Sequence, residues 1–314
     1  MTDNHPESRP AGGPVQKADE PGAAALTGGG SGPSRSLWSD AWHDLRRNPV
    51  FLLASAIVLT MISMVLFPTL WTSADPRACD LSRAREKPSA EHPFGFSNLG
   101  CDYYAQVVHG AGPSIQIAVF ATIGVAVLGT LFGILSGYYG GWTDALVSRF
   151  IDVVAGLPFL LGAVVILALL RSRSIWAVVL VIVALSWITL ARVIRSSVLT
   201  TKNLDYVAAA RSLGASDRRI IFRHILPNAL APGLVILTIA LGLYVAAEAT
   251  LTFLGVGLRA PTVSWGVMIV QGQSHVLSGY PHLLLVPVSF LVLTVLGFIM
   301  LGDALRDALD PKLR

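Results

Sequence analysis

Long apolar runs separated by short polar stretches dominate the chain from residue 50 onward. Six runs have about the length that a helix needs to cross a bilayer, so each is predicted to be a membrane-spanning helix. The predicted spans are residues 50–73, about 113–137, 153–170, 174–191, about 227–253 and 283–302. Pro158 and Pro287 interrupt the third and the last span and are expected to permit bends. The pattern predicts an all-α membrane protein with both ends on one side.

The polar N-terminal part predicts two further segments. Residues 1–35 are rich in Pro and Gly and lack apolar periodicity, which indicates a disordered cytoplasmic tail. In residues 36–49 apolar side chains share one helical face and charged side chains the other, which predicts an interfacial elbow helix along the membrane surface. Its apolar face consists of Leu37, Trp38, Ala41, Trp42 and Leu45. Residues 50–314 then form the six-helix transmembrane domain.

Composition and charge agree with a membrane protein. With 53% hydrophobic and 13% charged residues, the chain is too apolar for an ordinary soluble domain. The net charge of +4 does not indicate nucleic-acid binding, because the basic residues are not gathered on a soluble domain. These residues are expected instead to set the orientation of the chain in the membrane. Fourteen basic residues lie near the inner ends and seven near the outer ends if the N-terminus is cytoplasmic. Both termini are therefore expected inside, with an extracytoplasmic loop at 73–112 and a cytoplasmic loop at 192–226.

The cytoplasmic loop has the pattern of a helix, a turn and a second helix. Tyr206, Ala209, Ala210 and Leu213 follow helical spacing, and Gly214 can occupy the left-handed position that ends a helix. The second helix, over residues 217–225, precedes Pro227, which marks the entry into the next apolar run, and the segment is expected to be continuous with the span that follows. It carries three arginines and an isoleucine stripe: Arg218, Arg219, Arg223, Ile220, Ile221 and Ile225. The plain alternative is a basic loop that only fixes topology.

The order of residues in this loop resembles the "EAA" loop of ABC-importer permeases. It reads Ala208-Ala209-Ala210, then Gly214, Ile225 and Leu226-Pro227. In that family the loop is the coupling helix that docks into a groove on the ATPase subunit. The resemblance implies coupling residues Ala208, Ala209, Ala210, Leu213, Gly214, Ala215, Ser216 and Asp217. Ala208 replaces the family's Glu, which puts that polar contact in doubt and leaves the small residues for docking.

Other motifs narrow the resemblance. His92-Pro93-Phe94-Gly95 and Leu99-Gly100-Cys101-Asp102 are similar to the HPFGTDxLGRD run of the C-type permease subunit of bacterial dipeptide and oligopeptide ABC importers. The motifs that follow in the family's order start at Gly137, Phe253, Pro261, Ser264 and Leu301, and together they cover most of residues 36–314. Their order and spacing identify the chain as a member of this family.

Membership implies a type I ABC-importer transmembrane domain in the cytoplasmic (inner) membrane that imports peptides by alternating access. The implied partners are a homologous second permease, two ATPase subunits or domains and an extracytoplasmic solute-binding protein. ATP and Mg would be bound by the ATPases, so this chain would be non-catalytic and bind no cofactor or metal. Nickel and other small solutes are carried by the same fold, so the substrate stays open. The arginines would pair with acidic groups on the partner or with anionic lipid headgroups.

One glutamate in a span and two cysteines in the extracytoplasmic loop are further candidates. Glu248 lies well inside the fifth span, where a carboxyl group is costly. It either holds helices together, which we favour, or lines the translocation pathway. Cys79 and Cys101 lie in the extracytoplasmic loop and are free thiols or, in an oxidising compartment, a disulfide. Cys101 stands where the family has Arg, which suits a disulfide particular to this lineage.

Other functional classes fit the sequence less well. No Walker motif is present, so the chain is not expected to hydrolyse ATP. The glycines at 255–257 follow a membrane helix rather than opening a βαβ unit, which argues against dinucleotide binding. An ion-coupled secondary transporter would carry several ionisable groups at midplane and an inverted repeat. A receptor or scaffold would have a sizeable soluble domain.

Overall fold

Five helices are long and apolar enough to cross a membrane, or six crossings if one bent pair is counted as a single span. The structure, a computed structural model, describes residues 42–309. The predicted tail at 1–35, residues 36–41 of the elbow helix and residues 310–314 lie outside the described part. Within it, residues 42–45 are helical. The five long helices are α2 (Pro49–Leu66), α4 (Tyr103–Ile134), α7 (Ile175–Thr201), α10 (Leu226–Phe253) and α12 (His282–Leu309).

The predicted third span is not one straight helix. α5 (Gly141–Ala155) and α6 (Phe159–Leu170) meet at 84° across a break of three residues. Pro158 stands directly before α6, and a proline ring clashes with the preceding helical turn while disfavouring helical geometry in the residue before it. The bend expected at Pro158 is therefore confirmed, and it is sharp enough to divide the span. Pro287, by contrast, lies inside α12, which continues through it.

Three long helices, α4, α7 and α12, extend well beyond the bounds that the sequence predicted. α4 begins at Tyr103 rather than near Pro113, because Asp102 caps its first turn by accepting a hydrogen bond from the backbone N–H of Ala105 at 2.8 Å. α7 continues to Thr201 instead of ending at the start of the predicted cytoplasmic loop. The expected loops at 73–112 and 192–226 are therefore shorter. Among described residues the remaining elements are α3 (Pro68–Trp71), η1 (Leu81–Arg83), η2 (Leu135–Tyr139), α8 (Asp205–Ser212), α9 (Asp217–Ile220), η3 (Ile221–Ile225) and α11 (Trp265–Gln273).

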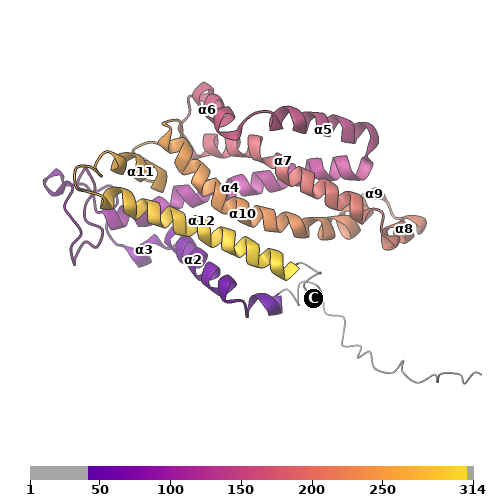
Figure 1. The fold of residues 1–314 in the computed structure, drawn as a ribbon, viewed down its shortest axis with the longest axis horizontal. Coiled ribbons are helices and arrows are strands. Elements are labelled where there is room, and N and C mark those ends of the chain that lie inside the picture. The colour runs from indigo at the N-terminus through magenta and orange to yellow at the C-terminus, as the bar shows by residue number, and fades with distance from the viewer. Residues whose placement is uncertain (1–41, 310–314) are drawn as a thin grey trace, which may run out of the picture. The chain divides into compact units, whose positions relative to one another are not determined.

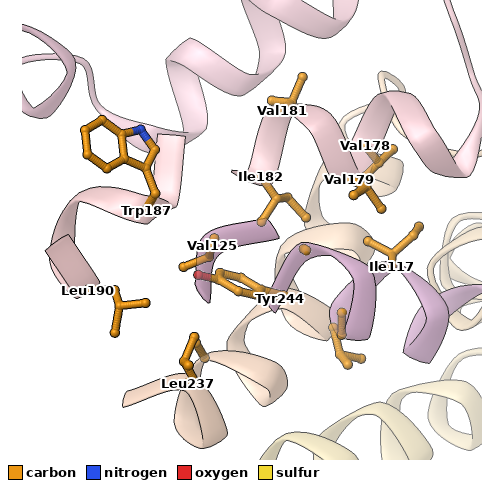
Figure 2. Packing of buried hydrophobic residues seen from close by; sticks show 14 of the residues in the cluster. Ile117, Val125, Val178, Val179, Val181, Ile182, Trp187, Leu190, Leu237 and Tyr244 are labelled. Carbon is orange, nitrogen blue, oxygen red and sulfur yellow. The ribbon is translucent and has the colours of Figure 1, made fainter. Parts of the chain in front are cut away.

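The core lies where α4, α7 and α10 pack together. Figure 2 shows Tyr244 of α10 among apolar side chains of α4 and α7, including Val125 and Ile182. α4 approaches α7 closely along a row of glycines, since small residues let two helix backbones come near each other. A Cβ atom on Gly129 would lie 2.8 Å from Cβ of Leu190, and one on Gly133 would lie 2.7 Å from Cβ of Ile194. Larger residues at these two positions would force the helices apart.

The ends of the long helices carry different structures. Figure 1 shows α11 and the loop that precedes α4 at one end, and α8 and α9 at the other. α8 and α9 join α7 to α10, whereas α11 lies between α10 and α12. The candidate coupling residues and the two cysteines are therefore at opposite ends of the helices.

Candidate functional site

The segment that joins α7 to α10, residues 205–220, is here named the knuckle. It consists of α8, a turn and α9, as the sequence predicts. The backbone N–H of Gly214 donates to the carbonyl of Arg211 at 3.0 Å, and that of Ala215 donates to the carbonyl of Ala210 at 3.1 Å. These two bonds form a Schellman motif, which places one residue in the left-handed region. Gly214 takes that place with φ of +82° and has no atom near its missing Cβ.

The tip of the knuckle presents small and apolar groups outward. The side chain of Leu213 is 88% exposed, although burying a leucine is worth about 1.5–3 kcal/mol. Val207 is fully buried and anchors α8 against the helices. Of the other candidate coupling residues, Ala210 and Ala215 are half-buried and the rest are exposed: Ala208, Ala209, Gly214, Ser216 and Asp217. The candidates therefore form one continuous outward tip.

The second helix of the knuckle, α9, continues into α10 without a break. α9, η3 and α10 form one continuous helix over Asp217–Phe253, so the expected continuity of this segment with the following span is confirmed and Pro227 does not interrupt it. η3 is a π-helical turn that ends two positions before Pro227, and such a widened turn accommodates a residue that has no N–H. Displacement of α9 therefore passes directly into α10. Arg218, Arg219 and Arg223 are exposed and make no ion pair within residues 42–309.

Polar contacts connect the knuckle to the turn between α4 and α5. The hydroxyl of Tyr138 donates to Oδ1 of Asp217 at 2.6 Å. From the other side, Nζ of Lys202 donates to the carbonyl oxygen of Gly137 at 2.7 Å. Both contacted residues belong to η2, which ends α4. The turn is therefore bonded to the chain on both sides of α8.

An ion pair joins the same turn to α7. The guanidinium of Arg195 donates twice to Asp144, from Nε to Oδ1 and from Nη2 to Oδ2, each at 2.6 Å. Such paired bonds fix the relative orientation of the two groups as well as their distance. The hydroxyl of Ser136 also donates to Asp144. The first turn of α5 is thus fixed to both α4 and α7.

A second polar cluster lies toward the opposite end of α10, around Glu248. The carboxyl of Glu248 is fully buried and accepts hydrogen bonds from Ser114, Thr252 and Ser264 at 3.0, 3.0 and 3.1 Å. Each of these hydroxyls also accepts a backbone N–H, from Trp265, Leu258 and Val267 respectively. Every polar group of the cluster has a partner, and α4, α10 and α11 meet there. This arrangement favours the helix-joining role for Glu248.

Comparison with known proteins identifies the family. Residues 129–314 match the family model described as "Binding-protein-dependent transport system inner membrane component", and residues 36–88 match "N-terminal TM domain of oligopeptide transport permease C". The chain belongs to this permease family. The permease is 37% identical to the dipeptide transport system permease protein DppC of Alkalihalophilus pseudofirmus, covering 89% of this chain and 91% of that one. It is also 37% identical to the oligopeptide transport system permease protein OppC of Bacillus subtilis, covering 90% and 92%.

A solved structure supports the fold. The permease aligns with a chain of the MetNI methionine ABC transporter, in a structure described as inward facing, with a TM-score of 0.52 and 22% identity. The alignment covers 65% of the permease and 96% of that chain. At this identity the likeness concerns the fold alone. The all-α fold, the ABC-importer transmembrane architecture and the family that the motifs indicated are confirmed.

The loop before α4 contains the HPFG motif of the permease. Nδ1 of His92 lies 2.8 Å from Oδ2 of Asp102, the residue that caps α4. Cys79 and Cys101 are joined in a disulfide, and Cys101 directly precedes Asp102. Gly100 has φ of +76°, and a Cβ atom there would lie 1.8 Å from the carbonyl oxygen of Asp80. The motif therefore builds a closed loop over the start of α4.

Several residues of the site were not singled out by the sequence. Tyr138 and Asp144 lie in or beside the motif that starts at Gly137, and Lys202 and Arg195 contribute only to the number of basic residues near the inner ends, so the sequence predicts no partner for any of them. Their partners lie between 51 and 79 residues away along the chain, beyond the range of local periodicity. A polar residue beside a helix-ending glycine pair, as at Tyr138 and Asp144 around Gly140 and Gly141, is a signal that could have indicated contacts at this helix end.

Proposed function

We propose that this permease subunit carries peptides inward across the cytoplasmic membrane by alternating access, driven by ATP that separate subunits hydrolyse. The observation that carries the proposal is the exposed, apolar tip of the knuckle on a helix continuous with α10. A docking element that transmits force should be short, well capped and joined rigidly to a membrane helix. The knuckle is short, its Schellman motif caps α8, and its second helix, α9, is continuous with α10.

The names of the relatives support a peptide substrate. They include dipeptide and oligopeptide permeases, and a glutathione transport system permease protein from Pectobacterium atrosepticum that is 34% identical over 89% of the chain. Glutathione is itself a small peptide-like molecule, so the named cargoes share one chemistry. Peptides are therefore favoured over nickel or another small solute.

The same proposal assigns partners and orientation. A second, homologous permease would complete the pore, two ATPase subunits or domains would bind the knuckles, and an extracytoplasmic solute-binding protein would deliver the peptide. The excess of basic residues near the knuckle end supports cytoplasmic termini. Ala208, Ala209, Ala210, Leu213, Gly214, Ala215, Ser216 and Asp217 would form the docking tip. The exposed arginines are free to contact acidic groups on the ATPase or lipid headgroups.

Reconstitution tests the proposed function. The permease, its second permease, the ATPases and the binding protein are placed in proteoliposomes, and uptake of a labelled dipeptide and a labelled tetrapeptide is measured. We expect uptake that needs both the binding protein and ATP hydrolysis, with none when a non-hydrolysable ATP analogue is supplied. Peptide uptake by this chain alone, in vesicles that hold an ion gradient and no ATP, would instead assign it to secondary transport.

A further inference from the structure

The covalent chain connects the knuckle to only two membrane helices. Its first helix, α8, follows α7 along the chain, and its second helix, α9, continues into α10. The bent pair α5–α6 is not joined directly to the knuckle: α6 precedes α7, and α5 follows α4 beyond η2. Along the chain, a movement of the knuckle reaches α6 only by way of α7, and it reaches α5 directly through contacts across the fold.

Tyr138 provides such a contact. Its side chain is 9% exposed, whereas that of its neighbour Tyr139 is 54% exposed. η2 is π-helical, and a π-helical turn changes the direction in which successive side chains leave a helix. In this register the hydroxyl of Tyr138 meets the carboxyl of Asp217 at 2.6 Å. A hydrogen bond to a charged carboxylate is stronger than one between neutral groups, so this contact can transmit force.

Three more contacts carry the displacement onward. Lys202 is bonded to the carbonyl of Gly137, so η2 is connected to the chain both before and after α8. Asp144, in the first turn of α5, is bonded to Ser136 of η2 and to Arg195 of α7. α5 then leads to the 84° bend before α6. The bonded groups thus form an unbroken series from α9 to the bent pair.

We propose that Tyr138 is a positioning residue that couples movement of the knuckle to the bent pair α5–α6 through its hydrogen bond with Asp217. This inference rests on the proposed function, because it presupposes an ATPase that moves the knuckle. Arg195 and Lys202 connect the α4–α5 turn to α7, and the bond from Tyr138 connects the same turn to α9. With the bond in place, the turn follows α9, and the bend between α5 and α6 changes with it.

Replacement of the hydroxyl tests the inference in the reconstituted complex. Tyr138→Phe keeps the ring and removes the donor, and we expect the number of peptides imported per ATP hydrolysed to fall about tenfold, as for a lost charged hydrogen bond. ATP hydrolysis and co-purification of the ATPase should be retained. Asp217→Ala should lower the number of peptides imported per ATP by the same factor. The double variant should lower it no further, because both changes remove the same hydrogen bond.

The matched control is Tyr139→Phe, which makes the same change in the adjacent residue. The hydroxyl of Tyr139 makes no hydrogen bond within residues 42–309, so import per ATP should equal that of the unaltered complex. If Tyr138→Phe fails to assemble, Asp217→Ala tests the same bond from an exposed position, and co-purification of the ATPase is measured with it because Asp217 also belongs to the docking tip. If Asp217→Ala leaves the number of peptides imported per ATP hydrolysed unchanged, the role of Tyr138 is overturned and the proposed function is not affected. Absence of ATP-driven import in the unaltered complex overturns the proposed function instead.

Discussion

Replacing Gly214 with valine should reduce ATP-driven peptide import about tenfold or more, since a non-glycine residue in the left-handed region costs about 1–2 kcal/mol. Gly214 has φ of +82° at the turn that closes α8, and valine is branched at Cβ and fits this conformation poorly. The Schellman motif would open, and the tip that carries Leu213 would lose its fixed position. Import is measured in proteoliposomes, with co-purification of the ATPase as the measure of docking.

Gly279→Val is the control for this substitution. Gly279 has φ of +86° and, like Gly214, no atom within 4 Å of the place that a Cβ atom would take, but it lies in the loop between α11 and α12. Both variants carry the same local backbone cost at opposite ends of the helices. We expect import by Gly279→Val to stay within about twofold of the unaltered permease, because the same backbone cost then arises far from the knuckle. Full import by Gly214→Val would contradict the role of the knuckle.

Glu248→Ala should lower the free energy of unfolding by about 3 kcal/mol or more, since each buried group left without a partner costs about 1–3 kcal/mol. The substitution removes the acceptor of three buried hydroxyls, those of Ser114, Thr252 and Ser264. It also leaves a cavity where α4, α10 and α11 meet. Thermal unfolding of the purified complex in detergent measures the effect.

Thr250→Ala is the corresponding control on α10. Its hydroxyl is exposed and bonds only to the carbonyl of Ala246 in its own helix, so its removal should change stability by less than about 0.5 kcal/mol. Glu248→Gln keeps one acceptor oxygen and the side-chain volume, and should lie between the other two variants. A Glu248→Gln complex with unaltered thermal stability but no import would contradict the helix-joining role. The carboxyl would then belong to the translocation pathway.

Local sequence patterns predicted much of this fold. The period of apolar residues located the membrane helices, and Gly214 marked the turn of the knuckle because the left-handed conformation is a local property. Helix ends were less accurate. Pro113 suggested a start for α4, but the cap supplied by Asp102 moves that start to Tyr103.

Contacts between distant segments could not be predicted from one sequence. Ser114 and Glu248 are 134 residues apart, and Tyr138 and Asp217 are 79 apart. Neither pair has a local pattern, because the partner of a polar residue depends on how whole helices pack. The bend between α5 and α6 was anticipated from Pro158, whereas its angle depends on the contacts of α5 with α4 and α7. The sequence therefore located the candidate site, and the structure supplied its connections.

Cross-linking from the tip of the knuckle tests most directly whether this segment docks on a separate ATPase. The sequence contains two cysteines, which are joined to each other, so Leu213→Cys introduces a single free thiol at a position that is 88% exposed. Leu277→Cys places a thiol at a position that is 100% exposed between α11 and α12, and serves as the control. With a short bifunctional reagent in the assembled complex, Leu213→Cys should link to the ATPase and Leu277→Cys should not. Linkage of the ATPase to Leu277→Cys, with none to Leu213→Cys, would contradict the account.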